Sequence, residues 1–180
     1  MRGSGKDEPA EVEVEVVEAS PGGDLTRHAD PAAVVDALAS TYGIPRATLE
    51  GFEYYHTGHK LFAVRKAEGA QVSDLPALDV YRVGLYVARI EGSLPHGLRL
   101  TMDGAQLWGG ECAYWAELDD GSFRAWMRGE EVPLPPAAAM KLPPAPVPWF
   151  VVKHRGLPVG CTKKAKDRLL NFVPKERRTL

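Results

Sequence analysis

The sequence predicts an α+β domain that is mostly β and barrel-like, with one or two helices packed on it. Two features support this fold class. Short segments rich in Val, Tyr and Phe are separated throughout the chain by Gly- and Pro-containing turns, which is typical of sandwiches and barrels. The clearest helix pattern lies at 28–43, and 45–51 adds a further short turn. The chain has 180 residues and is 44% hydrophobic, so it can bury a core.

An acidic arm over residues 1–20 is expected to precede one domain over 21–178. The arm contains six acidic and two basic residues, and its stretch EVEVEVVE at 11–18 alternates with a period of two. That alternation predicts a half-buried strand, and a solvated acidic arm is the alternative. The domain begins with a helix and hairpin lobe at 28–104. Its helix starts at Asp30 and Pro31 and ends at Gly43, each a favoured residue at that position.

Paired strands are predicted through the middle of the chain. FEYYH and KLFAVRK form a hairpin around Thr57-Gly58-His59. DVYRVGLYVARIEG at 79–92 predicts a longer strand pair with a bulge or a close approach at Gly84. LPHGLRLTMDGAQLWGG fits either a strand or a short helix. CAYWAELDDGSFRAWMRGEEV at 112–132 predicts a strand, an Asp-Asp-Gly turn and a second strand.

The barrel and a basic closing segment are expected over 105–178. A Pro-rich connector at 133–148 should be extended, and it leads to two strands around a turn at His154-Arg155-Gly156. A last short strand is predicted at RLLNFVP. From Val151 onward there are nine Lys and Arg but two acidic residues, in a chain of net charge −2. Clustered cations of this kind predict an anionic partner such as RNA, and a solvated basic tail is the alternative.

No catalytic or metal-binding motif is evident. The sequence lacks a P-loop, HExxH and GxSxG, and it has no GxGxxG after a strand. His56 and His59 lie three residues apart without an evident third ligand, so neither a metal nor a cofactor is predicted. Cys161 lies among lysines that would lower its pKa, but no orienting base accompanies it. An enzyme with an unrecognised site would need a deep pocket lined by these residues.

The cysteine count and the apolar runs predict a cytoplasmic protein with no membrane partner. Cys112 and Cys161 are far apart and in no paired spacing, which excludes a disulfide scaffold and fits a reducing compartment. No run approaches 18 apolar residues, and the start MRGSGKDEPAEVEV has no signal-peptide core.

The closing segment has the residue types that RNA binding requires. Its Lys and Arg side chains can neutralise phosphates, and Gly156 and Gly160 allow a backbone to come close to a ligand. Asn171 offers a donor and an acceptor to a base edge or a 2′-hydroxyl. Three aromatic residues could stack bases if they are exposed, and at least one of the first two is expected in the core: Trp149, Phe150 and Phe172.

VVKHRGLPVGCTKKAKDRLLNFVPKERR resembles the end of the Sun/Fmu-type RNA cytosine-5 methyltransferases that modify small-subunit rRNA. Two further stretches, VYRVGLYVARIEGSLPHGLRL and WMRGEEV, resemble elements of the same family in the same order, over about residues 50–178. The matching positions are Arg82, Gly84, Leu85, Pro95, His96, Leu98, Arg128, Gly129, Glu130, Arg155, Gly156, Leu157, Pro158, Gly160, Lys163 or Lys164, Leu169, Asn171, Pro174, Lys175 and Arg178. The chain departs from the family at Ala88, Gly97 and Leu170, which should change RNA contacts rather than the fold.

The resemblance implies a PUA-like pseudo-barrel that binds RNA. It implies that Lys163, Lys164, Lys175 and Arg178 contact phosphate, that Asn171 and Arg155 read shape or a base, that Gly156 and Gly160 allow close approach, and that Arg82 braces the barrel or extends the positive surface. The family's Pro-Cys nucleophile pair is absent and 180 residues leave no room for its methyltransferase domain, so no enzyme activity is carried over.

Three functions follow as hypotheses. The first is a stand-alone RNA-binding protein acting on rRNA or tRNA, in RNA modification, ribosome biogenesis or ribosome association. The second is an accessory subunit that binds a separate RNA methyltransferase through the acidic arm and the Pro-rich loop. The third is the small enzyme with an unrecognised site.

Overall fold

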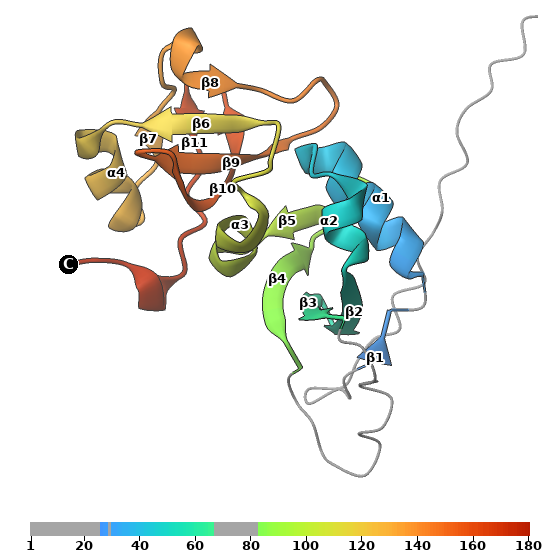
Figure 1. The fold of residues 1–180 in the computed structure, drawn as a ribbon. Coiled ribbons are helices and arrows are strands. Elements are labelled where there is room, and N and C mark those ends of the chain that lie inside the picture. The colour runs from blue at the N-terminus through green and yellow to red at the C-terminus, as the bar shows by residue number, and fades with distance from the viewer. Residues whose placement is uncertain (1–25, 29, 67–82) are drawn as a thin grey trace, which may run out of the picture.

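The computed structural model describes residues 26–28, 30–66 and 83–180. Two sheets, with helices packed against them, make up this part of the chain (Figure 1). The predicted strand at 11–18 and the predicted RNA-binding residue Arg82 lie outside the described residues. Within the described ranges, no helix combines the length and the apolar character needed to cross a bilayer.

The first sheet contains five antiparallel strands in the order β1-β2-β3-β4-β5. These strands are β1 (Thr26–Arg27), β2 (Phe52–Thr57), β3 (Lys60–Arg65), β4 (Leu85–Ile90) and β5 (Leu98–Leu100). The predicted hairpin is confirmed as β2 and β3, and Gly58 in its turn has a φ of 51°. Of the strand pair predicted at 79–92, the described residues form the single strand β4.

Two helices cover one side of the first sheet, α1 (Pro31–Tyr42) and α2 (Arg46–Glu50). The prediction for α1 is confirmed in detail. The Asp30 carboxylate accepts a hydrogen bond from the backbone N–H of Ala33 at 2.9 Å, and Gly43 ends the helix with a φ of 68°. Val34, Leu38 and Tyr42 lie on its buried face, as the period of the sequence indicates.

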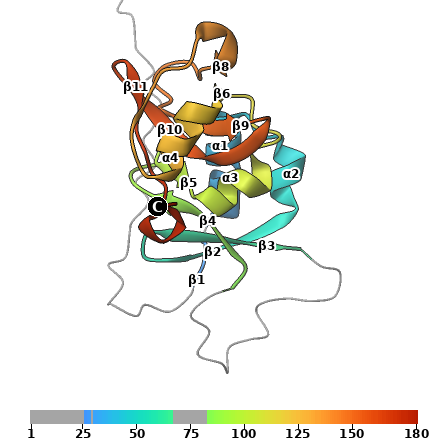
Figure 2. The same cartoon turned by 90° about the vertical axis from the view of Figure 1, so that its left-hand side faces the viewer.

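The second sheet contains six strands in the order β7-β11-β10-β9-β6-β8 and curls into a half-barrel (Figure 2). Its strands are β6 (Trp115–Leu118), β7 (Val132–Pro133), β8 (Met140–Lys141), β9 (Trp149–His154), β10 (Leu157–Ala165) and β11 (Arg168–Leu169). All neighbours are antiparallel except β6 and β9, which run parallel. The strands predicted around residues 154–156 are confirmed as the β9–β10 hairpin.

The prediction of a second strand after the Asp-Asp-Gly turn is wrong, because residues 120–127 form helix α4 (Asp120–Met127). The Asp119 carboxylate accepts from the backbone N–H of Ser122 at 2.7 Å and caps the helix. Phe123, Trp126 and Met127 then follow with helical spacing, and the Trp126 side chain is fully buried. Asp-Asp-Gly-Ser suits a turn and a helix start equally well, and the apolar spacing after it decides between them.

The ambiguous stretch after residue 94 contains both predicted alternatives, strand β5 and helix α3 (Met102–Trp108). The described residues therefore contain four α-helices, where one or two were predicted, and two 3₁₀ turns at Ala137–Ala139 and Lys175–Arg177. The fold class is nevertheless confirmed, because most elements are strands and the six-stranded sheet forms a half-barrel.

The buried side chains form two clusters, and the larger one joins the two sheets. Trp149, Val151 and Cys161 of the second sheet pack in the same cluster as Leu38 of α1 and Leu98 of β5. The Tyr42 hydroxyl lies inside this cluster. It donates to the carbonyl of Leu98 at 2.9 Å and accepts from the N–H of Leu100 at 3.0 Å. The smaller cluster fills the half-barrel around Trp126 and Phe150.

Acidification is expected to weaken the fold through His28. This side chain is almost fully buried, and its ring centroid lies 5.4 Å from that of His56. Burial and the charge of His56 lower the pKa of His28, and burial lowers the pKa of His56. The unfolded chain therefore binds more protons than the folded chain as the pH falls through about 6.5, the ordinary value for histidine. Stability should then decrease with falling pH.

Urea unfolding at pH 8 and at pH 5 measures this effect. Wild type should lose stability at the lower pH, and His28→Gln should lose less. His59→Gln is the matched control, since His59 is an exposed histidine on the hairpin turn, and it should behave like wild type. If His28→Gln and wild type showed the same pH dependence, His28 would not be the group responsible.

Candidate nucleic-acid interface

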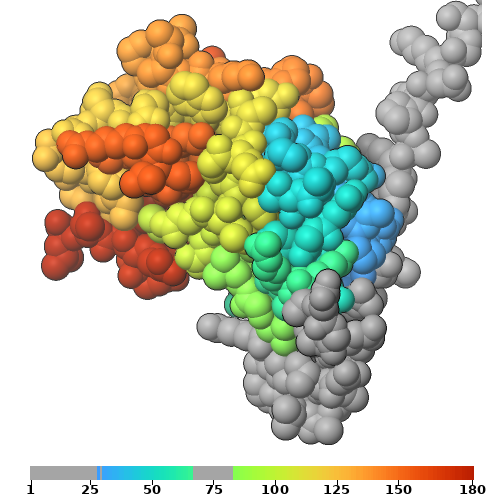
Figure 3. All heavy atoms as spheres, in the orientation of Figure 1, coloured from blue at the N-terminus to red at the C-terminus, as the bar shows by residue number. Residues whose placement is uncertain are grey.

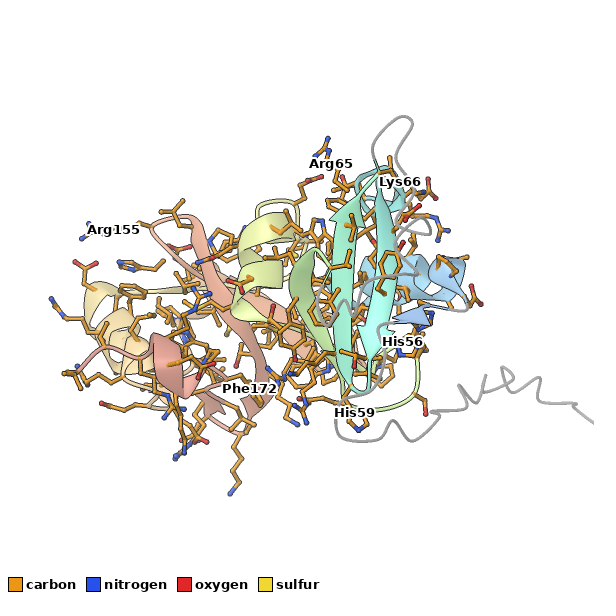
Figure 4. The ribbon with its side chains drawn as sticks, turned by 90° about the horizontal axis from the view of Figure 1, so that it is seen from below. His56, His59, Arg65, Lys66, Arg155 and Phe172 are labelled. Atoms are coloured by element: carbon orange, nitrogen blue, oxygen red, sulfur yellow. The ribbon has the colours of Figure 1, made fainter. Side chains whose placement is uncertain are left out.

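The β9–β10 turn places Arg155 and Gly156 at an exposed tip, remote from Phe172 (Figure 4). Both turn residues have positive φ, 51° and 75°, which is the backbone of a two-residue hairpin turn that follows the strand twist. The N–H of Gly156 donates to the Glu117 carboxylate at 3.0 Å. The positive φ that this turn requires therefore accounts for glycine at position 156.

Arg155 forms a bidentate ion pair rather than a free cation. Its guanidinium donates to the two carboxylate oxygens of Asp120 at 2.8 and 3.1 Å. The hydrogen bond from Arg155 lowers the pKa of Asp120 below its usual range. His154 stacks on Phe123 with ring centroids 4.1 Å apart, and its Nε2 lies 3.4 Å from Asp120. An RNA phosphate at this tip would have to compete with Asp120 for the arginine.

Gly160 lies in the interior of the half-barrel. It sits in an irregular part of the β9–β10 pairing, and a Cβ atom there would meet the Trp126 ring at 3.6 Å. That distance is an ordinary van der Waals contact, so the preference for glycine at position 160 comes from its backbone φ of 152°. The Trp126 ring lies beside Gly160, and close approach of RNA there stays a prediction.

Asn171 joins the closing segment, residues 151–180, to the end of helix α4. Its side-chain NH₂ donates to the carbonyls of Trp126 at 2.8 Å and Glu130 at 3.0 Å. Its side-chain oxygen accepts from the N–H of Val173 at 2.9 Å. Both donors of the amide are therefore used within the protein, and one acceptor lone pair is left for any other partner. This geometry gives Asn171 a structural role.

Arg178 also contacts the end of α4. Its Nε donates to the carbonyl of Val173 at 3.1 Å, and its guanidinium covers Gly129, which has a φ of 90°. A Cβ atom on Gly129 would overlap that guanidinium. WMRGEEV and PKERR, two of the stretches on which the resemblance rested, are thus in contact with each other.

The arginines and lysines of the closing segment have different surroundings. All four arginines are held by other groups of the protein: Arg155 by Asp120, Arg168 by Glu131 and Asp167, Arg177 by Asp103, and Arg178 by a carbonyl. Within the described part of the chain, no lysine of this segment lies within ion-pair distance of a carboxylate; these are Lys153, Lys163, Lys164, Lys166 and Lys175. The lysines are therefore the groups available to an anionic ligand.

Lys163 and Lys164 lie on opposite faces of β10. Lys163 pairs with Trp149 across the strands, and its Nζ lies 5.2 Å above the centre of that ring. Lys164 is exposed beside the Pro-rich segment, next to Pro146 and Lys166. A single RNA strand on one face would therefore meet one of these lysines and not the other. Red atoms in Figure 3 show the end of the closing segment at the surface beneath α4.

The aromatic residues proposed for base stacking are divided between core and surface. Trp149 and Phe150 are both buried, in different clusters, whereas Phe172 is half-buried. Figure 4 shows Phe172 on the side of the closing segment that lies toward the first sheet. Of the three, Phe172 alone is placed where a ligand could reach it.

Among the residues considered for the hypothetical enzyme site, Cys161 lies in the core. Cys161 is buried in β10, 3.3 Å from the Tyr42 hydroxyl, and burial raises its pKa to about 11. The expected lowering by neighbouring lysines is therefore wrong, because desolvation outweighs distant positive charge. Among the described residues, no group of three His, Cys, Asp or Glu side chains is placed to hold a metal ion.

A groove that the sequence did not predict lies between the first sheet and the closing segment. It has a volume of about 620 Å³. We call it the Arg89 groove, and its walls include Lys60, Tyr86, Arg89, Arg99, Phe172 and Arg177. Lys60 and Phe62 alternate in the sequence, whereas Tyr86 and Arg89 are three residues apart and face the same side through an irregularity in the β3–β4 pairing. Only the strand pairing, however, brings these positions to one face.

Comparison with known families agrees with the fold of the C-terminal part. Residues 115–179 match the family model described as the methyltransferase RsmF PUA domain. The matched segment begins at β6 and extends through the closing segment, and it leaves out the first sheet. A search of curated proteins gave no match. PUA domains are RNA-binding modules without catalytic activity, so the match suggests RNA binding.

Proposed function

We propose that this protein binds rRNA or tRNA through the closing segment, because residues 115–179 match the PUA domain of the RsmF-type methyltransferases. It would act in the cytoplasm, in RNA modification, ribosome biogenesis or association with the ribosome. These 180 residues would position RNA and supply no methyl transfer, since they contain no Pro-Cys pair. A methyltransferase on another polypeptide, or the ribosome, is the partner that this role implies.

The observation that carries the proposal is the division between paired arginines and unpaired lysines. An ammonium group is a compact point charge that attracts phosphate without demanding one geometry. Five such groups, without carboxylate partners among the described residues, on a segment that matches a PUA domain, favour contacts with the phosphate backbone. Contacts to phosphate position RNA, whereas sequence is read from base edges. We therefore propose recognition dominated by charge and shape.

One further observation favours the accessory-subunit function as a second candidate. The Pro-rich segment borders a hollow of about 350 Å³ that is lined mainly by apolar residues, among them Leu142, Pro146 and Val147, with Lys164 and Lys166 at its edge. An apolar surface beside two cations suits a protein segment with apolar and acidic residues. This function would give weak RNA binding with little salt dependence.

Salt dependence of RNA binding tests the proposed function. The double variant Lys163→Ala with Lys164→Ala should flatten the slope of log K against log salt by about two if both lysines contact phosphate, and by about one if RNA lies on a single face of β10. The single variants separate the two faces of β10. Lys163→Gln should weaken binding and flatten the slope by about one, because Lys163 lies on the face that leads to Phe172.

Lys164→Gln is the matched control, with the same charge change one residue away on the other face. It should bind like wild type in a titration of fluorescent tRNA at several salt concentrations. Equal losses in the two single variants would contradict the assignment of one face. Wild-type binding that is weak and insensitive to salt would contradict RNA binding itself and favour the accessory-subunit function.

A further inference from the structure

The Arg89 groove carries a row of three cations across the first sheet. Strand pairing places Lys60 opposite Arg89, and Arg89 opposite Arg99. Like charges directly opposite each other on neighbouring strands destabilise a sheet. Among the described residues, the one carboxylate within ion-pair distance of the row is Glu91, 2.6 Å from Arg99 and 3.9 Å from Arg89. Glu91 and the Phe172 ring hold Arg99, whereas the described residues show no ion-pair partner for Lys60, so the row leaves positive charge for an anionic ligand.

Aromatic side chains lie beside these cations. Tyr86 on β4 and Phe172 in the closing segment both line the groove and are half-buried. The Arg99 guanidinium lies 4.7 Å above the centre of the Phe172 ring. Phe172 also contacts Trp149 edge-on at 5.4 Å, and Lys163 covers Trp149. Phe172 thus connects the groove, through the buried Trp149 ring, with the face of β10 on which Lys163 lies.

We propose that the Arg89 groove binds an unpaired strand of RNA, with its phosphates on Lys60 and Arg89 and its bases against Tyr86 and Phe172. This inference rests on the proposed function and adds the form of RNA that is bound. In a duplex the base faces are stacked inside the helix, so aromatic rings recessed in a groove can serve only unpaired bases. Lys60, Arg89 and Arg99 lie outside the matched segment, so the first sheet would extend the RNA surface beyond the PUA-like domain.

The test compares two RNAs and two pairs of substitutions. The probes are a fluorescent uridine strand of about 12 nucleotides and a hairpin with a duplex of similar length. The groove variant is Lys60→Gln with Arg89→Gln. The matched control is Arg65→Gln with Lys66→Gln, which removes the same charges at the far end of the sheet (Figure 4). All four side chains are exposed, so both variants should keep the wild-type melting temperature.

We expect the groove variant to bind the uridine strand about tenfold more weakly at low salt, with a salt slope lower by about two. Its binding to the hairpin should change less, and the control variant should bind both probes like wild type. If the groove variant bound the uridine strand like wild type while Lys163→Gln weakened binding, the groove proposal would fall and RNA binding would stand. Equal losses for strand and hairpin would overturn the assignment to unpaired RNA. If wild type bound neither probe, both proposals would fail.

Discussion

Asn171→Ala is expected to lower the free energy of unfolding by about 3 kcal/mol, at about 1 kcal/mol for each of three hydrogen bonds. The loss would release the carbonyls of Trp126 and Glu130 and the N–H of Val173. The Trp126 side chain is fully buried, so loosening its backbone should disturb the half-barrel core around it. Chemical denaturation measures this loss directly.

Gln106→Ala is the matched control, because Gln106 is an exposed amide on α3 and should be replaced at little cost. RNA binding separates the structural role of Asn171 from the base-reading role that the resemblance implied. At a temperature where the variant is folded, we expect the preference among RNAs to equal that of wild type. A variant as stable as wild type but with changed RNA preference would show that Asn171 reads RNA.

Gly104→Ala is expected to cost about 2 kcal/mol, even though alanine is the better helix former. Alanine gains about 1 kcal/mol over glycine inside a helix. Here, however, a Cβ atom would overlap the carbonyl oxygen of Val87, because α3 packs directly on the backbone of β4. Overpacking of backbone against backbone costs about 3 kcal/mol, since neither side can rotate away. The steric cost therefore outweighs the gain in helix propensity.

Thermal unfolding measures this effect, and about 2 kcal/mol corresponds to a fall of about 4–8 °C in a chain of this size. Gly110→Ala is the matched control, since a Cβ atom there meets nothing within 4 Å. Its melting temperature should stay near that of wild type. A Gly104→Ala protein that melted at or above the wild-type temperature would contradict the close contact between α3 and β4.

The elements that local sequence determines were predictable. Helix α1 has its cap, its first proline and its final glycine within 14 residues, and the hairpins have glycine in their turns. Helix α4 was missed because Asp-Asp-Gly-Ser also suits a turn. The apolar spacing that indicates a helix extends over two helical turns there, which is a short signal. The basic character of the closing segment was evident, and its match to a PUA domain is confirmed.

The candidate site was less predictable because its contacts are distant in sequence. Arg155 pairs with Asp120, which is 35 residues away in the sequence, and Arg177 pairs with Asp103, which is 74 residues away. No local pattern shows which cations are neutralised in this way. The Arg89 groove depends likewise on the pairing of β3, β4 and β5, and a shift of one residue would turn its cations to the opposite face. Composition thus predicted a kind of ligand, and the place proposed for it depends on tertiary structure.

The larger core cluster has a consequence for how this molecule can be divided. The family match begins at residue 115, yet Trp149, Val151 and Cys161 complete their burial against helices and strands that precede it. A polypeptide cut at that boundary would present a broad apolar face to water and would be prone to aggregate. The helices and strands before residue 115 cover that face in the intact chain. We therefore expect the two parts to unfold in a single cooperative transition.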